Sequence, residues 1–346
     1  MGNAADRNKI YINGAWVDSE GTDLIEVFNP DTEALIGTIV SGTAADVDRA
    51  VEAAVAAFPT WSALSGAERA AYLRSAQELL KARLPQLAEL VSEDLGSPTV
   101  FSQRVQVGMP MMNLGIFADL AENFDFDGEE VGNSLIVREP IGVVGAITPW
   151  NYPLHQIILK VGGALAAGCT VVLKAGGEAP FIAFALADVF DEIGLPAGVF
   201  NLVSGRGSVI GEAISSHPDI DMVSFTGSNG AGKRVAIVAA ETVKKVALEL
   251  GGKSAMIILD DADFETAVAD SVAKCMGNTG QTCSALTRLL VPADRLEEAT
   301  AIAKKVGEQF KIGAPTEEGV RMGPLVNAAQ RKIVEGYIQK GVDEGA

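Results

Sequence analysis

The residue of this sequence best suited to nucleophilic chemistry is a cysteine in a small polar segment. Cys283 closes the run Asn278–Cys283 (NTGQTC), whereas Cys169 sits among alanine, glycine and valine. A reactive thiol needs a partly open site with groups that stabilise the thiolate, while structural cysteines usually have apolar neighbours. The residue types alone leave two readings of Cys283 open, a nucleophile and an inert side chain.

A base to partner this thiol is hard to find among the histidines. The chain has only His155 and His217, and each reads as an ordinary surface or core histidine, which disfavours papain-like chemistry. Glu249 is the alternative, because it ends an apolar run between two leucines, where partial desolvation would raise its pKa and suit it to general-base work. The competing reading is an ion pair with a nearby lysine, and spacing alone favours that pair. The lysines in question are Lys244, Lys245 and Lys253.

Two more polar residues follow apolar runs. Asn151 stands in Pro-Trp-Asn-Tyr-Pro, where a neutral amide donor is able to stabilise an oxyanion, although the segment is an equally good turn. Lys174 ends the next apolar run. A buried strand seldom closes with an unpaired lysine, so we expect Lys174 to bond a ribose or a phosphate.

Two glycine-rich stretches compete for a pyrophosphate. Gly205, Gly207 and Gly211 give a spacing one residue longer than the dinucleotide fingerprint. The segment Phe225–Ser228 with Gly232 ends a predicted strand and starts a predicted helix, which is the right context for a phosphate at a helix N-terminus. Each signal is weak by itself.

Short apolar runs alternate with helix-length segments from Ile141 onwards, a pattern typical of parallel βαβ units in an α/β fold. The predicted strands are Ile141–Ile147, Thr170–Leu173, Val199–Val203, Met222–Phe225 and Val246–Leu250. The predicted helices are Leu154–Ala167, Phe181–Ile193, Val209–Ser215 and Gly230–Ala240. Ligands of such sheets bind outside the carboxyl ends of the strands, so the polar residues above should meet at one edge.

The first 120 or so residues predict short strands followed by amphipathic helices. Capping boxes at Thr43/Asp46 and Ser65/Glu68 each precede an apolar helical stripe, and a third helix is expected after Pro85. The acidic stretch Asp119–Glu130 predicts a solvated loop or hairpin arm and no metal site, since its carboxylates lack calcium-loop spacing. The run Ala255–Leu259 is expected to open a second domain.

Composition excludes several classes of protein. The 346 residues carry a net charge of -18, whereas a surface that binds nucleic acid is basic. The apolar stretch Val161–Leu173 is shorter than the ~20 residues of a membrane-spanning helix. The N-terminus lacks the apolar core of a signal peptide. Three cysteines offer no disulfide framework, so a soluble protein of the reducing cytoplasm is expected.

Taken together, four motifs resemble the aldehyde dehydrogenase superfamily in their order and separation. They are Thr148–Asn151 (TPWN), Phe225–Ser228 (FTGS) with Gly232, Leu248–Lys253 (LELGGK) and Gly280–Cys283 (GQTC). The resemblance runs from Tyr11 to Gly345. It implies a Rossmann-like parallel-sheet cofactor domain over 1–250, interrupted near 123–140 by an oligomerisation arm. Residues 251–346 would then be the N-terminal part of an α/β catalytic domain.

The resemblance also implies roles. Cys283 is the nucleophile, Asn151 the oxyanion donor and Glu249 the base that activates water to hydrolyse a cysteine thioester. A small-molecule aldehyde is the expected substrate, and NAD or NADP the expected cofactor. The residues expected to bind the cofactor are Ile147, Thr148, Pro149, Trp150, Lys174, Gly177, Glu178, Gly207, Gly211, Phe225, Thr226, Gly227, Ser228, Gly232 and Leu250.

The sequence departs from the family pattern in two places. The family usually continues its lysine with Pro-Ser-Glu, but here Gly177 stands where the ribose-binding glutamate is expected and Glu178 comes one place late. The chain also ends on the order of a hundred residues earlier than family members usually do. A truncated fragment that binds nucleotide without turnover, and a cofactor-free thiol esterase, are therefore competing readings. We expect little aldehyde oxidation by residues 1–346 alone, and a homo-oligomer at full length.

Overall fold

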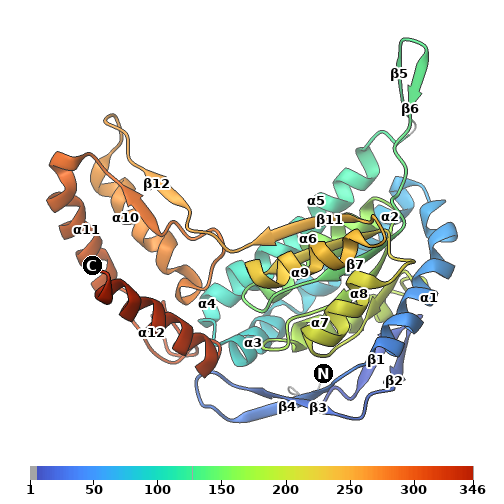
Figure 1. Ribbon diagram of the computed structural model, residues 1–346, viewed down its shortest axis with the longest axis horizontal. Helices are drawn as coiled ribbons and strands as arrows, with labels where there is room; N and C mark the ends of the chain where they lie inside the picture. The colour runs from blue at the N-terminus through green and yellow to red at the C-terminus, as the bar shows by residue number, and fades with distance from the viewer. Residues whose placement is uncertain (1–5, 127, 346) are drawn as a thin grey trace.

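A seven-stranded sheet forms the centre of the larger of two lobes in the computed structural model, which describes residues 6–126 and 128–345 (Figure 1). Its strand order is β11-β10-β7-β8-β9-β1-β2. The strands are β1 Lys9–Ile12, β2 Ala15–Asp18, β7 Val143–Ile147, β8 Thr170–Lys174, β9 Phe200–Leu202, β10 Met222–Gly227 and β11 Lys245–Leu250. The α/β class is confirmed, and the five predicted strands from Ile141 onwards form within two residues of their expected bounds.

The order of the strands creates a switch point beside β7. Strands β11 to β9 are parallel, while β1 and β2 close one edge in antiparallel pairs. The chain runs from β7 outward to β8 and β9, and then returns to β10 and β11 on the other side of β7. In an open parallel sheet a ligand binds at such a reversal, outside the carboxyl ends of the strands.

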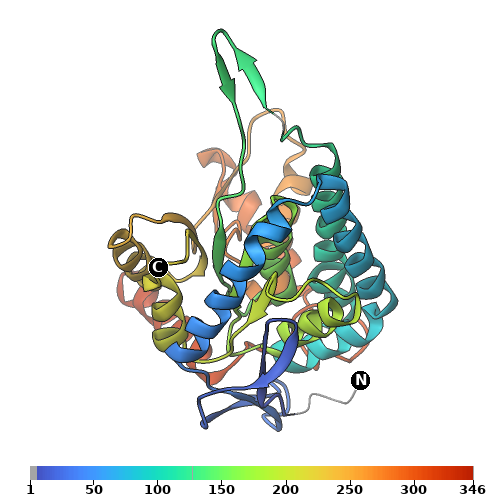
Figure 2. The same cartoon turned by 90° about the vertical axis from the view of Figure 1, so that its right-hand side faces the viewer.

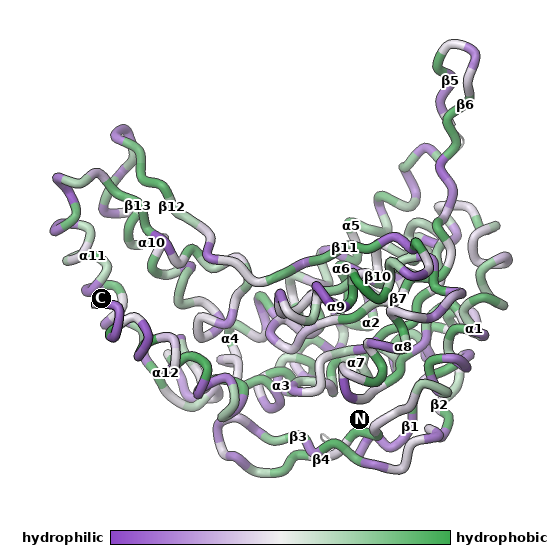
Figure 3. The backbone as a smooth tube through the Cα atoms, in the orientation of Figure 1, coloured by the Kyte–Doolittle hydropathy of each residue, from purple (hydrophilic) through white to green (hydrophobic). Residues whose placement is uncertain are grey.

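Helices cover both faces of this sheet (Figures 1 and 2). One face packs on α1, α8 and α9, and the other on α6 and α7, with α2, α3 and α5 outside them. The helices are α1 Ala44–Ser62, α2 Gly66–Ala82, α3 Leu84–Leu95, α5 Met109–Asn123, α6 Pro153–Ala166, α7 Phe181–Glu192, α8 Glu212–Ser216 and α9 Asn229–Ala240. Strands β7 and β8 are buried along their whole length, and β7 lies in a hydrophobic stretch of the tube (Figure 3).

The smaller lobe follows β11 and has its own core. Strands β12 (Ala255–Ile257) and β13 (Arg288–Leu290) pair in parallel and form a separate sheet. Helices α10 (Phe264–Met276) and α11 (Leu296–Glu308) pack together, and α12 (Ala328–Asp343) ends the described chain. Phe264, Val268 and Ala299 are buried in a hydrophobic cluster apart from the large sheet. The expected apolar run thus opens a second packing unit, at β12.

The acidic stretch Asp119–Glu130 is divided between a helix and a hairpin. Asp119 and Glu122 lie in α5, where Arg74 of α2 bonds them at 2.8 and 2.5 Å. The prediction of a loop is wrong for these two, because the ion pairs fix them against a neighbouring helix. Glu129 and Glu130 lie on β5 (Glu129–Val131), which pairs with β6 (Ser134–Ile136) in a hairpin that projects from the body (Figure 1). The acidic stretch also includes Asp127, which lies outside the described residues.

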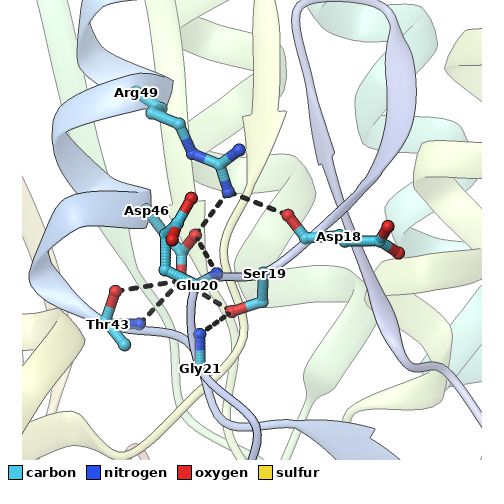
Figure 4. A network of polar contacts seen from close by, with 7 residues as sticks. All are labelled: Asp18, Ser19, Glu20, Gly21, Thr43, Asp46 and Arg49. Atoms are coloured by element: carbon cyan, nitrogen blue, oxygen red, sulfur yellow. Dashed lines mark hydrogen bonds and ion pairs between the residues drawn. The ribbon is translucent and has the colours of Figure 1, made fainter.

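Both predicted capping boxes form, and the first is part of a larger buried network. Asp46 is fully buried, and its carboxylate accepts hydrogen bonds from Ser19 Oγ at 2.6 Å, Thr43 N at 2.8 Å and Arg49 Nη2 at 2.6 Å (Figure 4). It also accepts from the Glu20 amide at 3.0 Å. The network ties α1 to the loop that leads into β3 (Leu24–Phe28), which pairs with β4 (Leu35–Val40).

Asp46→Asn is expected to destabilise the fold by about 3 kcal/mol at neutral pH, since several donors would lose a buried anionic acceptor. Burial raises the pKa of Asp46, but the hydrogen bonds outweigh burial and hold the pKa below its usual value. The stabilisation is therefore present above the unfolded pKa of about 3.9 and is lost as pH falls through the lower folded pKa. Urea denaturation across this pH range measures it. Glu52→Gln, an exposed change on the same helix, is the control; equal effects of the two changes would contradict the prediction.

Candidate active site

The predicted site residues gather at the carboxyl edge of the large sheet. Asn151 follows β7, Lys174 ends β8, Thr226 lies near the end of β10 and Glu249 near the end of β11. Register pairs Thr226 with Glu249 across β10 and β11. The Thr148 amide donates to the Lys174 carbonyl at 3.0 Å, which joins the first two strand ends. The edge expected from the strand pattern therefore exists, at the switch point.

The segment that carries Cys283 is bonded directly to Asn151. Asn151 Nδ2 donates to the carbonyl of Gln281 at 2.8 Å, and Asn278 Nδ2 donates to the carbonyl of Asn151 at 2.8 Å. Gln106 Nε2 donates to Asn278 Oδ1 and to the Asn151 carbonyl, both at 3.1 Å. An amide nitrogen carries two hydrogens, so Asn151 keeps a second one for another acceptor. Asn151 thus has donor capacity two residues from the thiol.

The backbone before Cys283 takes an unusual course. Asn278, Thr279 and Gly280 are consecutive left-handed residues, with φ of 53°, 58° and 71°. Asparagine and glycine tolerate this region, but β-branched Thr279 rarely adopts it, and such strain persists only where surrounding contacts hold it. Those contacts are the bonds of Asn278 described above and the Thr279 hydroxyl, which donates to Gly323 O at 3.3 Å. The turn delivers Cys283 to the surface of the site.

Cys283 is exposed and has neighbours from both lobes. A Cβ on Gly252, just after β11, would lie 3.5 Å from the Cys283 carbonyl oxygen. On the other side, the Tyr152 hydroxyl lies 2.8 Å from Thr282 Oγ1. Burial raises the pKa of Tyr152, the bond with Thr282 lowers it and the negative charge of Cys283 raises it further. The thiol therefore sits between the end of β11 and the start of α6.

Alkylation should label Cys283 before the other two cysteines. Cys283 is exposed and Cys275 is half-buried, whereas Cys169 is buried, which raises the pKa of its thiol and slows thiolate chemistry. Mass spectrometry after brief treatment with iodoacetamide gives the order of modification. Modification of Cys169 first would overturn Cys283 as the reactive thiol.

Glu249 differs from the expectation of a desolvated carboxylate. It is exposed and makes no ion pair among the described residues, so neither partial burial nor the competing lysine pair is present. The reason is that β11 is an edge strand, paired only with β10, so its two leucines cannot cover the carboxylate. Lys160 of α6 lies near enough for the charge of Glu249 to raise its pKa, although burial dominates and lowers that pKa to about 8. Lys160 Nζ donates to Ser224 Oγ at 3.1 Å.

A pocket of about 410 Å³ opens beside the end of β8. Its walls come from β3, from the segments that follow β8 and β9, and from the start of α12. They include Ile25, Val27, Phe28, Lys174, Gly177, Glu178, Gly205, Arg206, Gly207 and Asn327. Lys174 is only 7% exposed; burial lowers its pKa, and the charge of Glu178 opposes that effect. Its ammonium makes no hydrogen bond or ion pair with residues 6–126 or 128–345, which suits a polar ligand in this pocket.

Two buried hydroxyls at the switch point also lack partners. Thr148 Oγ1, after β7, and Thr226 Oγ1, on β10, are buried without a hydrogen bond in the described chain. Glycines keep the backbone close here: a Cβ on Gly176 would lie 2.8 Å from the Trp150 nitrogen, and one on Gly232 would lie 2.6 Å from Leu250 Cδ2. Two hydroxyl donors without partners, beside closely packed backbone, fit a ligand rich in hydrogen-bonding oxygens.

The two glycine-rich stretches occupy different parts of this edge. Gly205 and Gly207 line the pocket after β9, and Gly211 ends a π-helical turn, Gly207–Gly211, which precedes α8. The segment Phe225–Ser228 passes from β10 into α9, where the Ser228 side chain accepts from Ala231 N at 3.3 Å. Both stretches form turns between a strand and a helix, so both stay predicted cofactor contacts. Ile147, Pro149 and Gly227 also stay predicted contacts.

Sequence reasoning missed three residues of the site. Gln106 lies in a π-helical stretch, Ser102–Gly108, and reaches Asn278 over a separation of 172 residues. Tyr152 and Arg206 were passed over as parts of a turn and of a glycine run. The signals in the sequence are faint: a glutamine between two valines for Gln106, and an arginine between two glycines for Arg206. π-Helical turns are frequent at functional sites.

Comparison with known proteins gives a consistent picture. The model of the aldehyde dehydrogenase family matches residues 16–346. A 3-succinoylsemialdehyde-pyridine dehydrogenase from Pseudomonas sp is 46% identical over 99% of this chain and 72% of that protein. A cysteine-to-alanine mutant of aldehyde dehydrogenase C from Pseudomonas syringae, complexed with NAD⁺ and octanal, is similar with a TM-score of 0.96 and 45% identity, over 98% of this chain and 70% of that one. An E. coli NADP dependent enzyme has a TM-score of 0.93 at 34% identity, over 98% and 71%.

Proposed function

Because this chain belongs to the aldehyde dehydrogenase family, we propose that Cys283, Asn151 and Glu249 oxidise an aldehyde to a carboxylic acid with NAD⁺ or NADP⁺. The observation that carries the proposal is the hydrogen bond from Asn151 to the Gln281 carbonyl. It holds a neutral donor beside the exposed thiol of the nucleophile segment. The family that the four sequence motifs resemble is confirmed by the family model, which matches residues 16–346.

The first step belongs to Cys283 and Asn151. The Cys283 thiolate attacks the aldehyde carbon, and the carbonyl oxygen becomes an oxyanion. The second hydrogen of Asn151 Nδ2 and a backbone N–H near Cys283 donate to this oxyanion. The turn Asn278–Gly280 and its bonds hold the segment that carries the thiol against Asn151, which supports a fixed geometry for the attack.

The edge of the large sheet holds the cofactor. Lys174 and the pocket beside it suit the adenosine ribose, while Thr148, Thr226 and the start of α9 suit the remainder of the dinucleotide. A nicotinamide held there would supply the hydride acceptor for the oxidation, and Cys283 would keep the acyl group as a thioester. The orphan hydroxyls and the buried lysine are what support this assignment.

Glu249 completes the cycle. Its exposed carboxylate is reachable by water, takes a proton from it and directs the oxygen to the thioester carbon, which releases the carboxylic acid and Cys283. A water-activating base argues for hydrolysis over acyl transfer to coenzyme A.

We assign 1–250 to the cofactor domain and 251–346 to the catalytic domain, with 123–140 as an arm for a homo-oligomer. Exposed Val131, Leu135 and Ile136 on the projecting hairpin support that arm (Figure 2). In the described chain no helix has the length and apolarity to cross a bilayer. Three free cysteines favour a reducing compartment such as the cytoplasm.

Arg206→Ala is expected to weaken NADP⁺ binding about tenfold and NAD⁺ binding little, because a guanidinium at the mouth of the ribose pocket pairs with a 2′-phosphate. Gly177 supplies no carboxylate to repel that phosphate. Dissociation constants from calorimetry measure both cofactors. Arg234→Ala is the control, since Arg234 bonds Glu212 outside the pocket. A wild-type preference for NAD⁺ above roughly 100-fold would instead assign exclusion of the phosphate to Glu178.

Formation of reduced cofactor with a panel of aldehydes tests the proposed activity itself. The panel includes octanal and 3-succinoylsemialdehyde-pyridine, which the names of two relatives mention. These aldehydes differ chemically, since one is an alkyl chain and the other bears a ketone and a ring nitrogen. Because residues 1–346 alone are expected to oxidise little aldehyde, the assay uses a chain extended to family length. Reduction of neither NAD⁺ nor NADP⁺ by any aldehyde in that protein would count against the proposal.

A further inference from the structure

The start of α6 carries a row of side chains away from Cys283. Tyr152 precedes α6, and His155 and Leu159 lie one and two turns further along the same helix face. The Tyr152 and His155 rings meet edge to face, with centroids 6.4 Å apart. Since Tyr152 contacts Thr282, next to the nucleophile, the row leads from the thiol to His155.

Helix α5 packs beside α6 and supplies the other wall. Asn113 Nδ2 lies 3.3 Å from His155 Nδ1. Around this pair the two helices expose apolar side chains, with Met112 67%, Ile116 52% and Leu159 42% exposed. The result is an apolar surface that begins at the nucleophile and contains one polar pair.

The pair fixes the proton of the imidazole. An amide nitrogen only donates, so His155 Nδ1 must accept, and the ring proton lies on Nε2. Burial lowers the pKa of His155, which keeps the ring neutral near pH 7. Within the described chain, Nε2 makes no hydrogen bond to another protein group. His155 therefore offers a single N–H donor on an otherwise apolar surface.

The cofactor side of the thiol is the end of β11 and the carboxyl edge of β7 and β10, so an aldehyde reaches Cys283 from the side of Tyr152. On the premise of the proposed oxidation, we propose that His155, held by Asn113, selects aldehydes that carry a hydrogen-bond acceptor, a ketone oxygen or ring nitrogen, beyond the aldehyde group. A plain alkyl chain over this surface would cover the Nε2–H donor without replacing the hydrogen bond that this donor makes to water.

Protection of Cys283 from iodoacetamide tests this selection in the chain as it stands, because thiohemiacetal formation needs no turnover. The probes are hexanal and the hexanal derivative with a ketone on its penultimate carbon. We expect the keto aldehyde to protect at about tenfold lower concentration than hexanal. His155→Phe keeps the ring shape and should abolish that difference, while leaving protection by hexanal unchanged.

Two variants keep the test decisive. His155→Gln retains an N–H donor and should retain most of the preference, which a merely structural role of His155 would not predict. His217→Phe removes the only other histidine, beyond α8, and should leave the preference intact. Equal protection by both aldehydes, or a preference that survives in H155F, would overturn the inference. Failure of every aldehyde to protect Cys283 would instead overturn the proposed site.

Discussion

In a chain extended to family length, replacement of Cys283 by alanine is expected to lower kcat for aldehyde oxidation by roughly 10⁴-fold or more, the scale on which removal of a catalytic nucleophile acts. Without the thiol no covalent intermediate forms, and Asn151 has no oxyanion to stabilise. Cys283 does not line the cofactor pocket beside Lys174, so the dissociation constant of NAD⁺ should stay the same. Initial rates of reduced-cofactor formation and calorimetry measure the two quantities.

Cys275→Ala is the matched control, because Cys275 lies half-buried on α10 and no step requires it. It should leave the rate near that of the wild-type protein. If C283A retained its rate while C275A lost it, the nucleophile would have to be reassigned. A loss of NAD⁺ binding in C283A would indicate damage to the fold, which thermal unfolding reports independently.

Replacement of Glu249 by glutamine separates the two halves of the reaction. Acylation of Cys283 does not require this base, so an active preparation should release a burst of reduced cofactor. Steady turnover should then fall by roughly 10²–10⁴-fold, the usual scale for loss of a general base. Stopped-flow absorbance of the reduced nicotinamide resolves both phases.

Glu241→Gln removes an exposed carboxylate after α9 and should alter neither phase. Unchanged steady turnover in E249Q would remove Glu249 from the mechanism. Loss of both the burst and steady turnover would mean that Glu249 acts before acylation. Its role would then be to activate the Cys283 thiol and not the hydrolytic water.

Local patterns in the sequence determined the α/β fold and the edge at which the site forms. The apolar runs Thr170–Leu173 and Met222–Phe225 predicted β8 and β10 because a buried parallel strand is continuously apolar. The capping box at Thr43 and Asp46 predicted the start of α1, since its hydrogen bonds span only three residues. The order of the motifs that end in Cys283 gave the family, because each motif is contiguous.

Only the tertiary structure decided how distant segments meet. Gln106 bonds Asn278 across 172 residues, and no spacing rule in the sequence connects them. Glu249 is exposed because β11 has a neighbour on one side alone, and strand order is not written in an apolar run. Arg74 holds Asp119 in a helix pair where local composition indicated a loop. The spacing of apolar residues and the choice of turn residues determine local structure over a few positions. Burial and ion pairing depend on which elements pack together.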